Sequence, residues 1–316
     1  MKNYPNSLSN PVSDSGCPST LGEVDLFGNG CQEHWYQAYP ILHEQAPVMT
    51  LPGEGMGGIG DAFVLSCYED IERVVKNPER FTPVMSLMVE EMQAAVDKGD
   101  TPQQDTSRFD LALDSVRTLR PNQKLWRAHR QELTDPWVGP GARRHRQMIT
   151  QIVDELIDDW ISRKDGDGKG TVEFIQEFAR LLPQRVTARI LGLPFTDITR
   201  LANWGSAQVM QYVYGQGHLN ILNDSQMSQQ AEDLSGFADY LSDQVASKRA
   251  NPQDDMISDL TRIHYKALDR KLTDGEVYGI VYFMVLGGLE TTQYALEQQA
   301  QLLCDQPRLF ATLKAN

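Results

Sequence analysis

The sequence is poor in basic residues. It carries 29 Lys and Arg against 43 Asp and Glu, which gives a formal net charge of −14 at pH 7. A surplus of negative charge disfavours non-specific binding to nucleic acid and to anionic membrane surfaces. We therefore predict that the protein binds no nucleic acid and no membrane, and that its partners are small or locally basic.

Long hydrophobic runs and a secretory leader are also missing. The longest uncharged apolar run, Val277 to Leu289, falls short of the roughly 20 residues that a membrane-spanning helix needs. The first segment, Met1 to Leu21, is polar and has no apolar region of the signal-peptide kind. We expect a cytoplasmic protein in which residues 1–39 form a partly irregular arm and residues 40–316 form one domain.

Cysteine is scarce, and the few present form no recognisable framework. Cys17, Cys31, Cys67 and Cys304 show neither a CxxC pair nor a disulfide spacing, which suits a reducing compartment. The six histidines show no metal-ligand spacing. The glycine-rich stretch "GMGGIG" (residues 55–60) precedes a predicted strand instead of a helix, so it indicates a turn and not a dinucleotide site.

What the sequence does contain is mostly helical periodicity. Short apolar runs at 46–52 and 61–67 predict a hairpin-like pair of strands, and the segment 82–121 predicts a long loop or lid. A short strand followed by a helix is expected over 171–194. Further helices are predicted at 68–77, 122–133, 143–162, 197–213 and 226–249. The fold class is therefore mainly α with a small β-sheet.

A very long helix is predicted near the end of the chain. Thr273 and Glu276 form a capping-box pattern at its start, and Pro307 is expected in the first turn of the next helix. The helix between them would hold about 30 residues and be about 45 Å long. The run Val277 to Leu289 is apolar on nearly every face, which predicts that this helix crosses the core.

The stretch "GGLETT" (residues 287–292) is costly in the middle of such a helix. A helical glycine costs about 1 kcal/mol relative to alanine, and a buried carboxylate costs more unless it is paired or protonated. One interpretation is structural: Gly287 and Gly288 let a neighbouring helix approach, Glu290 reaches solvent, and the threonines bond back to carbonyls four residues earlier. The other is functional: Gly287 leaves room for a bound group beside the Thr291 hydroxyl.

A second pair of residues supports the functional interpretation. Trp126 and Arg130 are four apart in "KLWRAHR", so an indole N–H and a guanidinium are expected on one helix face. Both are donors suited to a carboxylate or phosphate. An ordinary helix with a packed Trp126 and a solvated Arg130 would show the same pattern.

Together the two motifs resemble those of the cytochrome P450 haem-thiolate monooxygenases. "GGLETT" looks like the family's oxygen-activation signature, small-Gly-x-acid-Thr-Thr/Ser, and Trp126 with Arg130 looks like its Trp-x-x-x-Arg pair. The order of elements agrees from about Pro40 onward, and the chain is most similar to the soluble bacterial branch. The resemblance implies a haem b cofactor, with Trp126 and Arg130 binding a propionate and with Gly287 and Gly288 over the distal face.

The resemblance also implies the reaction and its partners. The family inserts one oxygen atom into a hydrophobic small molecule, using dioxygen and two electrons from a ferredoxin or similar donor with its reductase. Glu290 and Thr291 would deliver protons for O–O cleavage. Phe283, Leu286 and Gly287 would contact substrate, with the rest of the pocket from segments 82–121 and 208–218. The basic cluster "RRHR" (residues 143–146) is usually a solvated face, but it is also a candidate dock for an acidic electron-transfer partner.

One expected part of the family pattern is absent. The thiolate loop, Phe-x-x-Gly-x-x-x-Cys-x-Gly, does not occur, and the Glu-x-x-Arg pair is matched only at Glu177 and Arg180, where a surface pair is expected. We therefore expect a C-terminally incomplete P450 fold that lacks about a quarter of the domain. The axial Cys would lie beyond Asn316, and this fragment alone would be inactive.

Two other functions stay open. A haem-free, catalytically inactive helical binding protein with the same fold would account for the absent cysteine. A peroxide-driven or rearranging haem-thiolate enzyme is the other alternative. The Glu290 and Thr291 pair argues against it, because such chemistry need not deliver protons to dioxygen.

Overall fold

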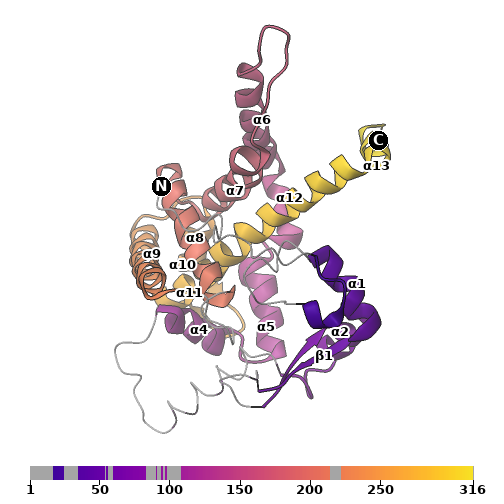
Figure 1. Ribbon diagram of the computed structural model, residues 1–316. Helices are drawn as coiled ribbons and strands as arrows, with labels where there is room; N and C mark the ends of the chain where they lie inside the picture. Colours follow the sequence, from indigo (N-terminus) through magenta and orange to yellow (C-terminus); the bar gives the residue numbers. More distant parts are fainter. Residues whose placement is uncertain are drawn as a thin grey trace. The chain divides into compact units, whose positions relative to one another are not determined.

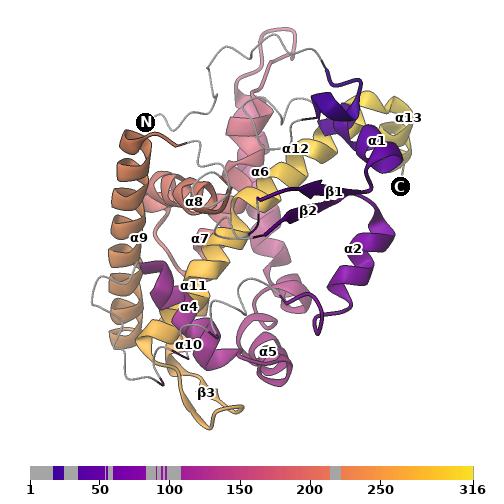
Figure 2. The same ribbon diagram turned by 60° about the horizontal axis from the view of Figure 1, so that its bottom comes forward.

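Figures 1 and 2 show the protein as a computed structural model. The structure describes residues 17–24, 35–53, 55, 60–82, 90, 94, 97, 108–213 and 222–315. Chain contacts divide it into two units, residues 1–87 with 214–221 and residues 88–213 with 222–316. The division into an arm (1–39) and one domain (40–316) stays a prediction. Every helix within the described residues is too short or too polar to cross a membrane.

The smaller unit contains the predicted strand pair. Strands β1 (Val48–Leu51) and β2 (Ala62–Leu65) pair antiparallel, with Val48 opposite Leu65, so the predicted hairpin is confirmed. The chain between them turns at Gly53 and Gly60, both with φ near +75°. Helix α2 (Tyr68–Val75) follows as predicted, and a small core is built from Val24, Ala38 and Leu42. The remaining elements of this unit are η1 (Leu21–Glu23) and α1 (Trp35–Gln45).

The larger unit is almost entirely helical, which confirms the mainly α fold class with small β-sheets. In chain order its elements are α4 (Arg108–Leu119), α5 (Gln123–His129), the π-helical turn η4 (Arg130–Thr134), the 3-10 helix η5 (Gly139–His145), α6 (Arg146–Ser162), the π-helical turn η6 (Ile175–Ala179), α7 (Leu181–Leu191), η7 (Phe195–Asp197), α8 (Ile198–Val213), α9 (Asp224–Ala250), α10 (Met256–Arg262), β3 (His264–Tyr265), β4 (Arg270–Lys271), α11 (Asp274–Gly288), α12 (Glu290–Asp305) and α13 (Pro307–Ala315).

Helix α11 forms the centre of this unit. It packs most closely on α4 and also contacts α9 and α7, an arrangement visible in Figure 2. Val277, Val281 and Val285 are almost fully buried, so the predicted core position of this helix is confirmed. The contact with α4 is close because Gly279 has no side chain: a Cβ there would overlap the Ser115 hydroxyl.

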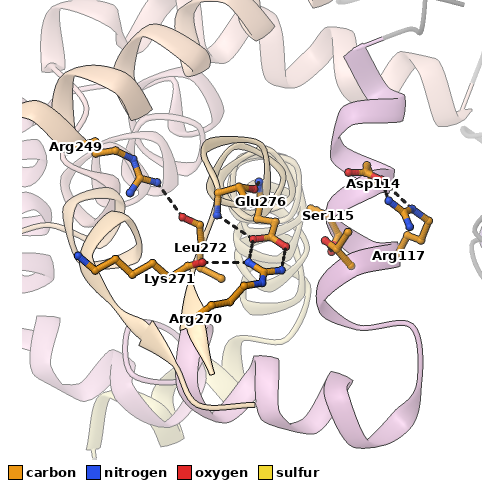
Figure 3. Close-up of polar contacts among 10 residues, drawn as sticks. Asp114, Ser115, Arg117, Arg249, Arg270, Lys271, Leu272 and Glu276 are labelled. Atoms are coloured by element: carbon orange, nitrogen blue, oxygen red, sulfur yellow. Dashed lines mark hydrogen bonds and ion pairs between the residues drawn. The ribbon is translucent and has the colours of Figure 1, made fainter. Parts of the chain in front are cut away.

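The start of α11 is fixed by the predicted capping box and by an ion pair that the pattern did not reveal (Figure 3). Thr273 Oγ1 accepts from the Glu276 N–H, and the Glu276 carboxylate accepts from the Thr273 N–H at 2.9 Å. The same carboxylate receives both ends of the Arg270 guanidinium at 2.7 and 2.8 Å. The Glu276 side chain is 4% exposed and that of Arg270 is 42% exposed, so a buried carboxylate is paired with a guanidinium of β4 at the surface.

The predicted single long helix is wrong at its middle. Leu289 separates α11 from α12, with φ −92° and ψ −78°. The break falls inside "GGLETT", next to two glycines and a threonine whose side chain competes with the backbone: Thr291 Oγ1 donates to the Gly287 carbonyl at 2.5 Å. Beyond the break, α12 contains no buried residue. Only the first half of the predicted helix is therefore core.

Three other predictions need correction. Residues 108–119 form helix α4 and not part of a loop; most of the predicted segment before it lies outside the described residues. The segment from Thr171 contains no strand and enters the π-helical turn η6. Glu177 does not pair with Arg180, because the Arg163 guanidinium from the end of α6 binds it with two hydrogen bonds.

Candidate active site

The end of α11 and the start of α12 present two adjacent faces. One carries Phe283, Gly287 and Thr291, which follow each other at intervals of four residues. Gly287 is exposed, and a Cβ placed on it would meet no atom within 4 Å. Thr291 is exposed beside it. We call these three residues the open stripe, because a bound group could reach the helix backbone at Gly287, the middle residue of the three.

The neighbouring face is packed instead of open. A Cβ at Gly288 would lie 2.8 Å from Thr187 Oγ1 of α7, and that hydroxyl donates to the Gly288 carbonyl at 3.4 Å. The structural interpretation is therefore confirmed for Gly288, which lets α7 approach. Its assignment to a haem stays a prediction. Beside it lies an apolar cavity of about 280 Å³ that Met284 and Thr292 help to line.

Glu290 points away from the open stripe, toward α8. It is partly buried, and burial raises the pKa of its carboxyl above the usual value, although hydrogen bonds from Ser206 and Tyr294 and the charge of Arg180 oppose the rise. The carboxyl therefore keeps its proton to a higher pH than a solvated glutamate. Glu290 and Thr291 are adjacent in sequence but lie about 100° apart around the helix, so the structure does not bring their side chains directly together.

Trp126 and Arg130 lie one turn apart, at the end of α5 and the start of η4. The Arg130 N–H bonds to the Trp126 carbonyl, which keeps the two residues on one side of the helix despite the change from α to π geometry. Trp126 is 47% exposed, and its indole N–H has no acceptor among the described residues. Arg130 Nη2 lies 2.9 Å from Asp135 Oδ1 and its side chain is 43% exposed. Both side chains thus keep donors that face solvent.

Two further basic residues adjoin this pair and were not predicted. His129 is 5% exposed and its Nδ1 has no partner among the described residues; burial, then the charges of Arg120 and Arg130, lower its pKa to about 4. Arg120 follows α4 and is half-buried, with its guanidinium carbon 5.1 Å from the centre of the Phe283 ring. A single histidine or arginine forms no recognisable sequence motif, so His129 and Arg120 could be identified only from their tertiary contacts.

The other predicted pocket residues are distributed as follows. Phe283 and Leu286 are partly buried, and Phe283 lies on the open stripe. Gln208, the first residue of the predicted segment 208–218, is fully buried and donates to the Tyr282 carbonyl at 3.2 Å, so it is a core residue. Most of the rest of that segment lies outside the described residues. The roles of Phe283, Leu286 and Gly287 toward a substrate stay predictions.

These residues fit a haem in two respects. The exposed donors of Trp126 and Arg130 suit a propionate, and the open stripe leaves room for a flat group at Gly287. Among the described cysteines, Cys304 is exposed and lies about 20 Å along α12 from Thr291. Within the described part of the chain, no group of three or more His, Cys, Asp and Glu residues forms a metal site.

Comparison with known proteins gives relatives of one kind. No protein-family model matches the chain. The curated cytochrome P450 CYP107DY1 of Priestia megaterium is 24% identical over 318 residues, which cover 96% of this chain and 67% of that protein. The vitamin D(3) 25-hydroxylase of Pseudonocardia autotrophica is 22% identical over 300 residues, covering 91% of this chain and 64% of the hydroxylase.

Solved structures show the same fold. P450BioI, in a complex with an acyl carrier protein that bears hexadec-9Z-enoic acid, matches with a TM-score of 0.66 at 20% identity, covering 90% of this chain and 65% of that one. The P450 PksS of Bacillus subtilis matches with a TM-score of 0.61 at 19% identity, covering 91% and 66%. The chain spans about two thirds of the length of these relatives. Over most of its length the chain is thus similar in sequence to bacterial cytochrome P450s, and it has their fold.

Proposed function

We propose that the complete protein is a haem-dependent monooxygenase that inserts one oxygen atom into a hydrophobic small molecule. The observation that supports this most directly is the break at Leu289. There Gly287 and Thr291 share an open face, while Glu290 beside them has a raised pKa. Proton delivery to dioxygen requires an accessible hydroxyl and a proton-bearing carboxyl within reach of it, and Thr291 and Glu290 supply these two groups from adjacent positions of the helix.

The chain's own residues would hold the cofactor and move the protons. Trp126 Nε1 and the Arg130 guanidinium would bind a propionate, and Gly287 would let the haem approach the helix backbone. When bound, the haem would supply dioxygen activation through its iron. Thr291 Oγ1 now donates to the Gly287 carbonyl. Turning that hydroxyl outward would let it donate to a bound group instead.

Glu290 would be the proton source for Thr291. Since the two side chains leave the helix in different directions, the carboxyl has to change rotamer or act through water to reach the hydroxyl. Its hydrogen bonds to Ser206 and Tyr294 would hold it in the resting position. A raised pKa keeps the proton on the Glu290 carboxyl to a higher pH than on a solvated glutamate, which favours a role as general acid.

The partners follow from the reaction. A ferredoxin or similar donor with its reductase would supply two electrons, and we place the protein in the cytoplasm, where such donors are reduced. The substrate would contact Phe283, Leu286 and Gly287. Vitamin D(3), the substrate named for the Pseudonocardia hydroxylase, and the hexadec-9Z-enoic acid on the carrier protein bound to P450BioI are both largely apolar, which supports a hydrophobic substrate.

The proposal is tested on the native protein purified from its source. We expect bound haem with a reduced carbon monoxide spectrum of the thiolate type, and turnover in which oxygen uptake equals product formation. Thr291→Ala should keep haem content and substrate affinity but release much of the oxygen as peroxide or water. Thr292→Ala, on the next face, is the matched control. Fully coupled turnover in Thr291→Ala would contradict the assigned role and favour the peroxide-driven or rearranging alternative.

The haem-free binding protein is the second candidate. It is the alternative that requires no thiolate ligand. The intact mass of the native protein, compared with the 35.6 kDa of this chain, separates the two. A mass larger by about a hundred residues supports the monooxygenase. An equal mass together with no bound haem supports the binding protein.

A further inference from the structure

Arg120 is a partly buried positive charge without a counter-charge. Its guanidinium lies over the Phe283 ring, and no carboxylate of the described residues is within ion-pair distance of it. Arg117 of α4, by contrast, binds Asp114 at 2.6 Å. A partly buried charge is costly unless something compensates it, and a ring face compensates only a small part.

The groups around Arg120 add to its positive potential. Arg130 from η4 and the buried His129 from α5 both interact with it electrostatically. The carboxylate of Asp135 is paired with Arg130. Burial, followed by the charge of Arg130, lowers the pKa of Arg120 below its ordinary value. An anion that bound here would therefore relieve both a desolvation cost and a like-charge repulsion.

The position of Arg120 relative to the open stripe indicates which anion would fit. Phe283, which it covers, is the first residue of that stripe, one turn before Gly287. From Phe283 to Thr291 the stripe is about 12 Å long. A molecule with its apolar body along the stripe would thus have one end at the Arg120 guanidinium, and the planar guanidinium suits a carboxylate, which it can grip with two hydrogen bonds.

We propose that Arg120 binds the carboxylate of an amphiphilic acid whose apolar part lies along the open stripe. This inference rests on the proposed function, because it names the substrate class of the same site. It adds that the substrate bears a carboxylate, whereas the proposed function specifies only a hydrophobic small molecule. A haem propionate carries the same carboxylate group, so the experiment has to separate the two.

The test compares dodecanoate with dodecanol on the native haem protein and on two variants, Arg120→Gln and Arg117→Gln. Binding is measured by calorimetry and haem content by absorbance on the same samples. We expect Arg120→Gln to keep its haem, to weaken dodecanoate binding by about 10- to 100-fold, and to leave dodecanol binding unchanged. Arg120→Lys should restore part of the dodecanoate affinity. Arg117→Gln should affect neither ligand.

Each other outcome overturns the inference. If Arg120→Gln loses haem while dodecanoate binding per haem is unchanged, the carboxylate at Arg120 is a propionate. If dodecanoate and dodecanol weaken together, Arg120 acts through folding or shape and not through charge. If the wild-type protein binds haem and dodecanol but prefers dodecanol to dodecanoate, the carboxylate site at Arg120 is wrong while the proposed monooxygenase function stands. If it binds neither haem nor dodecanol, the proposed function fails with it.

Discussion

At the scale of single residues, the basic cluster near Trp126 shows how burial changes a side chain's chemistry. His129 is 5% exposed, beside Arg120 and Arg130, and its pKa is lowered to about 4. In the unfolded chain the same histidine binds a proton near pH 6.5. Above about pH 6.5 this histidine therefore has no effect on the free energy of unfolding. As the pH falls from about 6.5 to about 4 the free energy of unfolding decreases, because the unfolded state binds a proton that the folded state does not.

This predicts the behaviour of His129→Phe. The free energy of unfolding of the variant, relative to wild type, should rise by about 3 kcal/mol as the pH falls from about 6.5 to about 4. Urea unfolding at a series of pH values measures it. His264→Gln, at an exposed histidine of β3, is the control and should track wild type. Parallel curves for His129→Phe and wild type would show that His129 does not titrate differently on folding.

The two glycines of the motif give a second residue-scale prediction. Gly287→Ala places its methyl group in open space, so it should raise the free energy of unfolding by about 1 kcal/mol. Gly288→Ala puts a Cβ 2.8 Å from Thr187 Oγ1, so the helix-propensity gain should be reduced or reversed. Thermal unfolding compares the two. Equal stabilisation by both alanines would mean that α7 does not approach Gly288 as closely as the structure shows.

The same two glycines show what sequence can and cannot predict here. The motif "GGLETT" indicated both a bound group and a close helix contact, but it could not say which glycine serves which purpose, because that depends on where α7 lies. Arg120 and His129 were missed for a related reason. Their significance comes from neighbours distant in sequence, such as Phe283, and a lone basic residue predicts only a surface or core position.

At the scale of elements, the start of α11 was predictable and its end was not. The capping box of Thr273 and Glu276 is a local pattern, and the structure contains it. The break at Leu289 depends on the competition between the Thr291 hydroxyl and the backbone and on the contact with Thr187, which the pattern does not contain. Helix α4 was missed because the polar segment before it obscured its apolar spacing.

The Glu276 contact predicts a pH dependence for this element. Burial alone would raise the pKa of Glu276, but hydrogen bonds from Arg270, the Thr273 N–H and Thr118 outweigh it and lower the pKa below its ordinary value. The carboxylate therefore stabilises the fold above about pH 4.5, and this contribution is lost as the pH falls through the lowered pKa.

Glu276→Gln should accordingly lower the free energy of unfolding by about 2–4 kcal/mol at pH 7. The difference from wild type should shrink as the pH falls below about 4.5, where the unfolded chain begins to bind the extra proton, and it should be lost as the pH passes the lowered pKa of the folded carboxylate. Chemical denaturation at about pH 7 and about pH 3 measures both values. Asp259→Asn removes a carboxylate of an exposed pair with Arg262 and should change little. A loss that did not depend on pH would show that the shape of the cap, and not the charge of Glu276, stabilises the helix.

At the scale of the whole molecule, charge is distributed unevenly. The chain carries a net charge of −14, yet Arg143, Arg144 and Arg146 are all exposed on η5 and the start of α6. Arg144 is also held over the Trp137 ring, with its guanidinium carbon 4.2 Å from the ring centre. A local basic surface on an acidic protein can orient an acidic electron donor, and this attraction weakens with salt.

Charge reversal tests this docking surface. Arg143→Glu with Arg144→Glu should slow reduction by an acidic ferredoxin about 10-fold or more at low salt, and the difference should shrink as salt is added. Stopped-flow reduction at several ionic strengths measures the rates. Lys164→Glu, beyond the other end of α6, changes charge in the same sense and should have a small effect. An unchanged rate and salt dependence in the double variant would remove the cluster as a docking surface.

The interruption at Leu289 also has a mechanical consequence. Helix α12 has 16 residues, none of them buried, so it is about 24 Å long, and it contacts η6 and α7. A rotation of about 10° at Leu289, where the helix is already interrupted, would displace the far end of α12 by about 4 Å while α11 stayed fixed in the core. The contacts with η6 and α7 are therefore what holds the direction of α12.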